Sequence, residues 1–153
     1  MKQKPVSLSK ADTAILNSYK ILAEGLAEYL GEGCEIVIHS LGNLEHSVIK
    51  IINGQHTGRK EGSPITDLGL SMVKSLSEND SQKHMAYFNK TMDGIPLKSC
   101  SIAITGEKGY IIGLLCMSRA IWIRRVVRGL ISFRLAMVSR IILDKSETST
   151  SGT

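Results

Sequence analysis

Apolar positions recur with two different periods along the chain, and the change of period separates helical segments from strands. From Ser9 to Leu30 they recur at i, i+4 and i+7, which predicts an amphipathic helix. Ser9 followed by Asp12 suggests a capping box, and Gly31 is placed to end the helix. The apolar side of this helix is predicted to consist of Ile15, Tyr19, Leu22, Leu26, Tyr29 and Leu30.

Short β-branched or alternating segments follow the helix and are separated by glycine-rich links. Such segments are typical of strands. The sequence GEKG is a tight-turn signal and predicts that the last two strands form a hairpin. The predicted strands are residues 34–41, 47–53, 84–91, 98–105 and 110–117.

Residues 64–76 predict a short helix between the second and third strands, with Pro64 in its first turn. Its predicted apolar side is Ile65, Leu68, Met72 and Leu76. The order of elements indicates an α+β fold with one antiparallel sheet of five strands. With a flanking N-terminal helix and a helical segment between the second and third strands, the order resembles the layout of a PAS-type sheet, although periodicity alone indicates only one antiparallel sheet.

Composition places the chain among soluble globular proteins. Its 153 residues are 42% hydrophobic and 22% charged, which suits a domain with one core. The three cysteines lie in apolar stretches without paired spacing, which predicts buried thiols in a reducing compartment. The first residues contain no continuous apolar stretch typical of a secretory signal, so a cytoplasmic location is expected.

The net charge of +5 belongs entirely to the C-terminal part of the sequence. Residues 1–117 carry 12 cations and 12 anions, whereas residues 118–153 carry six arginines and one lysine against Asp144 and Glu147. The arginines would point around most of a helix, and they are too many for a transmembrane helix. Arginine density also suggests an alternative function, binding of nucleic acid or an anionic membrane surface through this tail.

The segment Asn53–Asp67 concentrates polar and turn-forming residues and is the main candidate for a site. As a recognition loop at the mouth of a pocket, it would present Arg59 to a carboxylate and His56 as a titratable group. Thr66 and Asp67 would add polar contacts, so these four residues are the predicted ligand-binding residues. As a simple connection, Asp67 would cap or pair locally with Arg59 or Lys60, and the glycines would supply positive φ angles.

Patterns typical of catalytic or metal sites are missing from the sequence. The four histidines lie on separate elements without zinc spacing, and alternation along a strand places Cys34 and His39 on opposite faces of the sheet. There is no Gly-x-Ser-x-Gly elbow and no glycine-rich phosphate loop. We therefore expect no enzyme, assign no catalytic residue, metal or cofactor, and keep a small α+β enzyme using His56 with Asp67 as an alternative.

Four stretches carry a resemblance to a known family. The sequences CEIVIHSL, NGQHTGRKEGSPITDLGL, KSCSIAI and IIGLLCM resemble the YheO-like PAS domain of bacterial helix-turn-helix transcriptional regulators, over about residues 15–117. The resemblance implies a cytoplasmic, non-enzymatic sensor of an unidentified small molecule. It also implies a homodimer formed through the N-terminal helix, and DNA binding by a separate helix-turn-helix domain. The alternative for the apolar stripe Ile15, Tyr19, Leu22 and Leu26 is packing on the sheet of its own chain.

The sequence departs from the family after Met117. Residues 1–117 are the expected sensory domain, and residues 118–153 form an apolar, arginine-rich tail with no resemblance to a DNA-binding domain. The cations also switch from lysine to arginine at this point. Our hypothesis is that the tail is a frameshifted or truncated continuation, in which case DNA would be bound only through a domain missing from this chain.

Overall fold

The first helix, α1 (Lys10–Leu30), is delimited by its capping residues in the structure, a computed structural model that describes residues 4–79 and 81–121. The Ser9 hydroxyl accepts the Asp12 N–H at 3.1 Å, and the Asp12 carboxylate accepts the Ser9 N–H at 3.0 Å. The predicted capping box is confirmed. Gly31, at φ 77°, donates its N–H to the Ala27 carbonyl at 2.9 Å and ends the helix as predicted.

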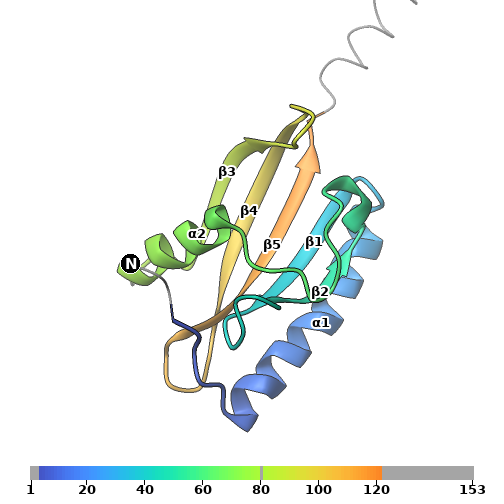
Figure 1. Cartoon of the computed structure of the whole chain (residues 1–153). Helices are drawn as coiled ribbons and strands as arrows, with labels where there is room; N and C mark the ends of the chain where they lie inside the picture. The colour runs from blue at the N-terminus through green and yellow to red at the C-terminus, as the bar shows by residue number, and fades with distance from the viewer. Residues whose placement is uncertain (1–3, 80, 122–153) are drawn as a thin grey trace, which may run out of the picture. The chain divides into compact units, whose positions relative to one another are not determined.

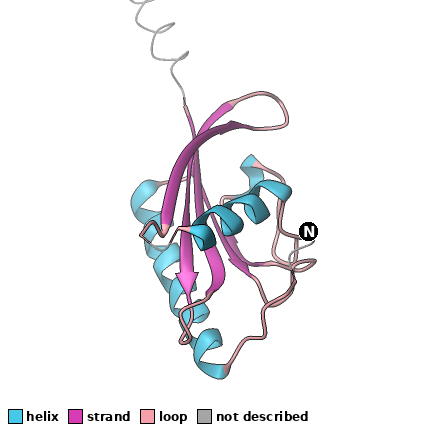
Figure 2. Ribbon diagram, turned by 90° about the vertical axis from the view of Figure 1, so that its left-hand side faces the viewer, coloured by secondary structure: helices cyan, strands magenta, loops and turns pink. Residues whose placement is uncertain are grey.

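Five strands form one antiparallel sheet in the order β2-β1-β5-β4-β3, which confirms the predicted fold class (Figure 1). Helix α1 covers one face of the sheet, and the helical segment between β2 and β3 lies on the other (Figure 2). That segment consists of the short turn η1 (Gly54–His56) and the helix α2 (Asp67–Glu78). The strands are β1 (Cys34–Ser40), β2 (Val48–Ile52), β3 (His84–Lys90), β4 (Pro96–Thr105) and β5 (Ile111–Ala120).

Alternation along β1 separates the two faces of the sheet. Cys34 belongs to the core under α1, whereas His39 lines a cavity on the opposite side. The prediction that these two side chains face opposite sides is confirmed. Because residues of the same parity share a face, Glu35 lies on the same side of the sheet as His39.

The core under α1 is apolar, and most of the predicted apolar side of α1 packs against it. Leu22 and Tyr29 are the exceptions, at 49% and 87% exposed. The small side chains of Ala23 and Ala27 are buried in this core. The buried residues of this core are Leu16, Ala23, Ala27, Cys34, Ile36, Ile38, Ile104, Ile112 and Leu115, flanked by the predicted Ile15, Tyr19, Leu26 and Leu30.

Helix α2 begins at Asp67, later than predicted. Thr66 is its N-cap, with its hydroxyl accepting the Gly69 N–H at 3.2 Å, so Pro64 precedes the helix rather than opening it. Leu68, predicted on the apolar side, is 40% exposed. The predicted Leu76 is buried, and the predicted Ile65 and Met72 pack against the same cluster. Gly69, where a Cβ would lie 2.8 Å from Ile65 Cγ1, and Val73 are buried as well.

Strand β5 continues beyond the expected domain boundary at residue 117. Ser118 pairs with Glu35 and Ser99, and Arg119 pairs with Cys34 and Lys98, so the sheet ends at Ala120. The predicted tail beyond residue 121 lies outside the described residues. In the part of the chain that the structure describes, no helix is long and apolar enough to cross a membrane.

Candidate functional site: a polar cavity on the sheet

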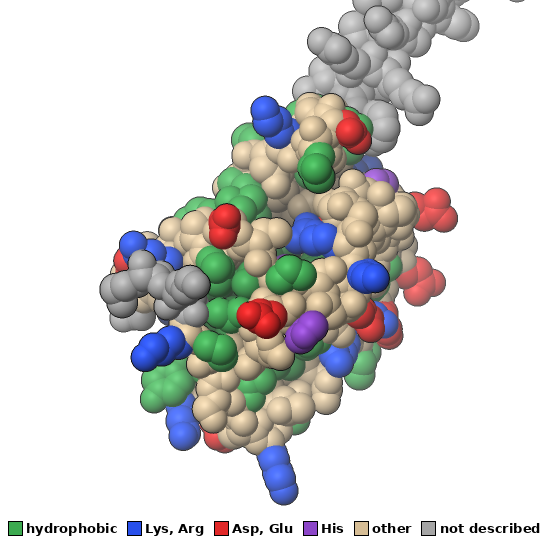
Figure 3. Space-filling view, viewed as in Figure 1, with side chains coloured by type: hydrophobic (Ala, Val, Ile, Leu, Met, Phe, Trp, Pro, Cys, Tyr) green, Lys and Arg blue, Asp and Glu red, His purple; other side chains and the backbone are tan. Residues whose placement is uncertain are grey.

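A cavity of about 690 Å³ lies on the sheet face opposite α1. The space-filling view shows a hollow there, with a cationic side chain at its edge (Figure 3). The sheet forms the floor, and the η1 segment, the start of α2 and the β3–β4 connection form the walls. The lining residues are His39, Gln55, His56, Thr57, Gly58, Arg59, Thr66, Leu68, Gly69, Tyr87, Asn89, Lys90, Thr91, Met92, Asp93, Leu97, Cys116 and Ser118.

Serine side chains occupy positions on this face of the sheet where a sheet core usually has apolar side chains. Ser118 lines the cavity, whereas Ser99 and Ser101 lie behind the lining and hydrogen-bond to it. Ser99, on β4, is 2% exposed and donates its hydroxyl to Asn89 Oδ1 at 2.9 Å. Its oxygen lies 2.8 Å from that of Ser118 on β5. Because the single Ser99 proton goes to Asn89, Ser118 is the donor in this second bond. The hydrogen bonds therefore run across three neighbouring strands.

A second polar row lies next to the first. Ser101 is 0% exposed, and its hydroxyl lies 3.1 Å from the Tyr87 hydroxyl and 3.3 Å from Cys116 Sγ. Burial is the main cause that raises the pKa values of Tyr87 and Cys116, so both groups are protonated at neutral pH. The floor thus offers neutral hydroxyl and thiol groups.

Arg59 reaches the cavity from the segment after η1 and is held by a buried carboxylate. Glu35, whose side chain is 1% exposed, accepts Arg59 Nη2–H at 2.9 Å. Thr57 donates its hydroxyl to the other Glu35 oxygen at 2.7 Å and accepts Arg59 Nε–H at 3.1 Å. These three bonds fix the plane of the guanidinium. The alternative that Arg59 pairs with Asp67 is wrong, since its partner is Glu35.

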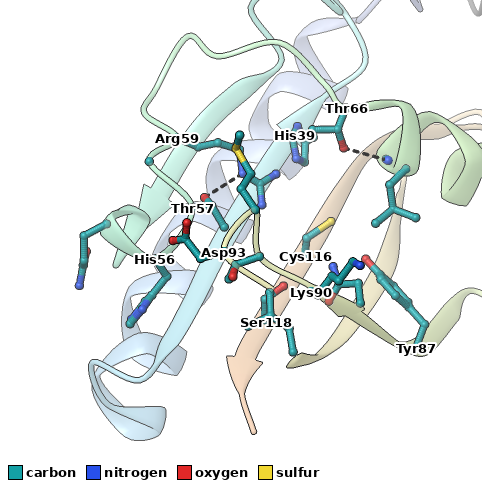
Figure 4. Close-up of a pocket in the computed structure, with 18 residues that line it drawn as sticks. His39, His56, Thr57, Arg59, Thr66, Tyr87, Lys90, Asp93, Cys116 and Ser118 are labelled. Carbon is teal, nitrogen blue, oxygen red and sulfur yellow. Dashed lines mark hydrogen bonds between the residues drawn. The ribbon is translucent and has the colours of Figure 1, made fainter. Parts of the chain in front are cut away.

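His39 is a buried neutral histidine beside this cation. It is 2% exposed, and its Nδ1 lies 3.0 Å from the Ser47 hydroxyl. Burial, and secondarily the Arg59 charge, lower the pKa of His39 from 6.5 to about 4. The close-up shows His39 and Arg59 entering the cavity from different elements, with Tyr87, Cys116 and Ser118 on the sheet (Figure 4).

The loop that carries Arg59 is anchored to the start of β1 and to the segment that precedes it. Asn53, at φ 58°, donates its side-chain amide to the Cys34 carbonyl at 2.8 Å, and His56 Nε2 donates to the Glu32 carbonyl at 2.6 Å. Gly54 is required by close approach, since a Cβ there would lie 2.6 Å from the Arg59 carbonyl oxygen. The loop therefore connects two elements and also forms a wall of the cavity.

The structure brings three of the four predicted ligand-binding residues to the cavity. His56, Arg59 and Thr66 are lining residues, whereas Asp67 is exposed in the first turn of α2 and is not among them. The Thr66 hydroxyl already caps the helix. His56 Nε2 bonds the Glu32 carbonyl rather than Asp67, so the geometry gives no support to a His56–Asp67 catalytic pair.

Sequence reasoning missed the polar lining residues His39 and Tyr87. It also missed three buried residues that hydrogen-bond to the lining: Glu35, Ser99 and Ser101. A signal was present, because Leu97, Ser99, Ser101 and Ala103 are the inward positions of one alternating strand, and two of them are serine. Within residues 4–79 and 81–121, no three or more His, Cys, Asp or Glu side chains converge to hold a metal ion. The arrangement is suited to hydrogen-bonding an organic molecule.

The sheet order β2-β1-β5-β4-β3, with a cavity between the sheet and the helical segment after β2, defines a PAS domain. The family model of the YheO-like PAS domain matches residues 9–126. The chain therefore belongs to the YheO-like PAS domain family, which confirms the resemblance seen in the sequence.

Relatives share nearly half of their residues with this chain over the matched region. An uncharacterized Escherichia coli K12 protein, YheO, is 47% identical over 109 residues, covering 71% of this chain and 45% of the relative. An uncharacterized Haemophilus influenzae protein is 46% identical over 107 residues, covering 70% of this chain and 48% of the relative. The chain thus spans about half the length of these relatives.

Among solved structures, a PAS domain from Colwellia psychrerythraea is similar, with a TM-score of 0.45 and 19% identity. The similarity covers 66% of this chain and 96% of that one.

Proposed function

We propose that this chain is the small-molecule-sensing domain of a bacterial transcriptional regulator. The observation that carries the proposal is the cavity of about 690 Å³, whose polar lining is hydrogen-bonded to buried polar groups behind it. Ligand pockets commonly have about 300–1,000 Å³. Buried hydroxyls and a buried ion pair lower stability relative to a well-packed apolar core, so a binding function explains why they occupy this face.

Binding would be reported through the loop and the strands that surround the cavity. Arg59 lines the cavity and is bonded to Glu35 on β1. Asn53 holds the same loop to Cys34 at the start of β1, and His56 holds it to Glu32 in the segment that joins α1 to β1. A molecule that contacts Arg59 would therefore change forces on the end of α1. Differential affinity for two arrangements of this helix would shift their populations.

DNA binding and dimerisation are further parts of the proposal. The family resemblance implies a helix-turn-helix domain, and this chain corresponds to about half of its relatives. Part of the predicted dimerisation stripe of α1 packs on its own sheet, whereas Ile21, Leu22 and Tyr29 are exposed at 73%, 49% and 87%. A homodimer through α1 and a cytoplasmic location remain predictions.

The proposal is tested by equilibrium binding of natural metabolites. The full chain is dialysed against a protein-free small-molecule extract of Escherichia coli, recovered and denatured, and the released compounds are identified by mass spectrometry. The Leu68→Trp variant places an indole at the cavity wall, where Leu68 is 40% exposed and folding should tolerate it. The matched control is Ile21→Trp on α1, where the original side chain is 73% exposed.

We expect at least one compound to be retained by the original chain and by Ile21→Trp, and to be reduced at least about tenfold with Leu68→Trp, which costs the complex about 1.4 kcal/mol or more. Retention of no compound, or equal retention by Leu68→Trp, would contradict a ligand-sensing role for this cavity.

A further inference from the structure

The hydrogen bonds around His39 determine which of its ring nitrogens carries the proton. The Ser47 hydroxyl lies 3.0 Å from the Ser40 carbonyl oxygen, and a carbonyl can only accept, so the single Ser47 proton is used there. Ser47 must then accept its second bond from His39 Nδ1–H, at 3.0 Å. In a neutral imidazole, Nε2 consequently has a lone pair and no proton.

His39 therefore presents a hydrogen-bond acceptor to the cavity that it lines. Nδ1 is occupied by Ser47, which leaves Nε2 as the ring nitrogen that can meet a bound molecule. The ring is fixed by its 2% exposure and by this bond, so it does not turn to offer a donor instead. A ligand group next to Nε2 must supply an N–H or O–H.

Arg59 presents hydrogen-bond donors to the cavity, whereas His39 presents an acceptor. Glu35 and Thr57 use one Nη2–H and the Nε–H, and a guanidinium has further N–H groups beyond these two. Arg59 lines the cavity with a side chain that is 25% exposed, so its remaining donors can reach a ligand oxygen. Because Thr57 and Glu35 fix the plane of the guanidinium, those donors have a set direction.

The fixed charges of the cavity nearly cancel. Glu35 neutralises Arg59, and the other two ionic side chains among the lining residues, Lys90 and Asp93, have opposite signs. Such a site has little excess positive charge with which to hold a polyanion such as a nucleotide. A small neutral, monoanionic or zwitterionic molecule matches it better.

We propose that the cavity selects small organic molecules that carry both a carboxylate or carbonyl oxygen for Arg59 and an O–H or N–H donor for His39 Nε2. This ligand class rests on the proposed sensing function and makes His39 a specificity-determining residue. A buried acceptor left without a donor discriminates strongly against molecules that lack one.

Matched sets of three compounds test the two requirements separately by thermal unfolding of the full chain at millimolar compound concentration. Each set contains a molecule with both groups, one with the carboxylate only (the acceptor-only molecule) and one with the hydroxyl but no carboxylate or carbonyl. The sets are lactate, propionate and 2-propanol; 3-phenyllactate, 3-phenylpropanoate and 1-phenyl-2-propanol; and 4-hydroxybenzoate, benzoate and phenol. We expect stabilisation by at least one complete molecule and weaker or no stabilisation by its two partners.

Variants assign the effect to the two side chains. Arg59→Met should weaken binding of the complete molecule at least about tenfold. His39→Phe should weaken it by a similar factor and reduce the difference between the complete and acceptor-only molecules. His46→Phe, at an exposed histidine that does not line the cavity, should change neither affinity.

A measurement on the unaltered chain keeps the inference testable if His39→Phe does not fold. Long-range proton–nitrogen correlation spectra of the histidine rings should show His39 protonated at Nδ1 and not at Nε2 at neutral pH. Protonation at Nε2, equal binding of acceptor-only molecules, or no binding by any complete molecule would each overturn the ligand class. If the metabolite extract still yields a ligand that Leu68→Trp excludes, only this class fails; if the extract yields none, the sensing function fails as well.

Discussion

The two faces of the sheet are built from the same strands but differ in chemistry, since one is apolar and the other is polar. Under α1, the side chains of Ile36, Ile38 and Ile104 are all 0% exposed and pack in an apolar cluster. On the other face, neighbouring positions of the same strands hold Glu35, Ser99 and Ser101, which are equally buried but hydrogen-bonded. The apolar face under α1 stabilises the fold. The polar face stabilises it less, and it provides a cavity with defined hydrogen-bond donors and acceptors.

Removing apolar volume under α1 should have the largest effect on stability. Ile36→Ala deletes a fully buried side chain, and such changes cost about 2–5 kcal/mol through lost burial and the cavity that remains. Denaturant unfolding of the full chain measures this loss. A cost below about 1 kcal/mol would mean that α1 does not form the main core with the sheet.

On the cavity face, stability should depend on pH through His39. Its pKa is lowered to about 4 in the folded chain, chiefly by burial, from the ordinary histidine value of 6.5 that applies when the chain is unfolded. The unfolded chain therefore binds more protons between these values, so stability is complete above about pH 6.5 and falls as the pH drops toward 4. The loss would reach about 3 kcal/mol.

His39→Gln should remove most of this pH dependence, whereas the exposed His46→Gln should leave it in place. Asp12 affects stability only at lower pH than His39, since hydrogen bonds from the Ser9 and Glu107 N–H groups lower the pKa of Asp12 below 3.8. An unfolding free energy that does not change between pH 4 and 6.5 would contradict a buried neutral His39.

Removing one partner of the Arg59–Glu35 ion pair should lower the free energy of unfolding. Glu35→Gln leaves Arg59 without its counter-charge, and because Arg59 is 25% exposed the loss should be about 1–3 kcal/mol. Adding Arg59→Gln to the same chain should cost less than the sum of the two single changes. Additive effects in this double-mutant cycle would show that the pair is not coupled.

The smallest effect is expected for a floor hydroxyl. Ser99→Ala removes the donor to Asn89 and the acceptor for Ser118, at a cost of about 0.5–1.5 kcal/mol. If Ser99→Ala weakens ligand binding by more than it lowers the free energy of unfolding, the polar face of the sheet serves mainly in binding. A cost as large as that of Ile36→Ala would make the floor a structural network rather than a binding surface.

Much of the fold could be predicted because its signals are local. The Ser9–Asp12 capping box, Gly31 and the alternation that separates Cys34 from His39 are read from nearby residues. The exposure of Leu22 and Tyr29 could not be predicted from periodicity, because the small residues Ala23 and Ala27 form part of the buried side of α1. The start of α2 differs from the predicted Pro64, since the sequence alone does not decide between two plausible first turns.

The candidate site was predictable only in part, because some of its contacts join residues that lie far apart in the sequence. The glycine-rich loop indicated Arg59, His56 and Thr66, and all three line the cavity. Glu35 lies 24 residues before Arg59 in sequence, and the Ser99–Ser118 contact joins residues 19 apart, so neither contact has a local pattern. Only the pairing of β1, β5 and β4 brings these groups to one face.

The most direct test of the account is the location of bound ligand on the sheet. Backbone amide spectra of the full, isotope-labelled chain would be recorded with and without the compound recovered from the metabolite extract. The account predicts that the largest shifts occur around Arg59, His39 and Ser118, with smaller ones along the exposed side of α1. Shifts concentrated on α1, with Arg59 and His39 unchanged, would show that the polar face is not the binding site.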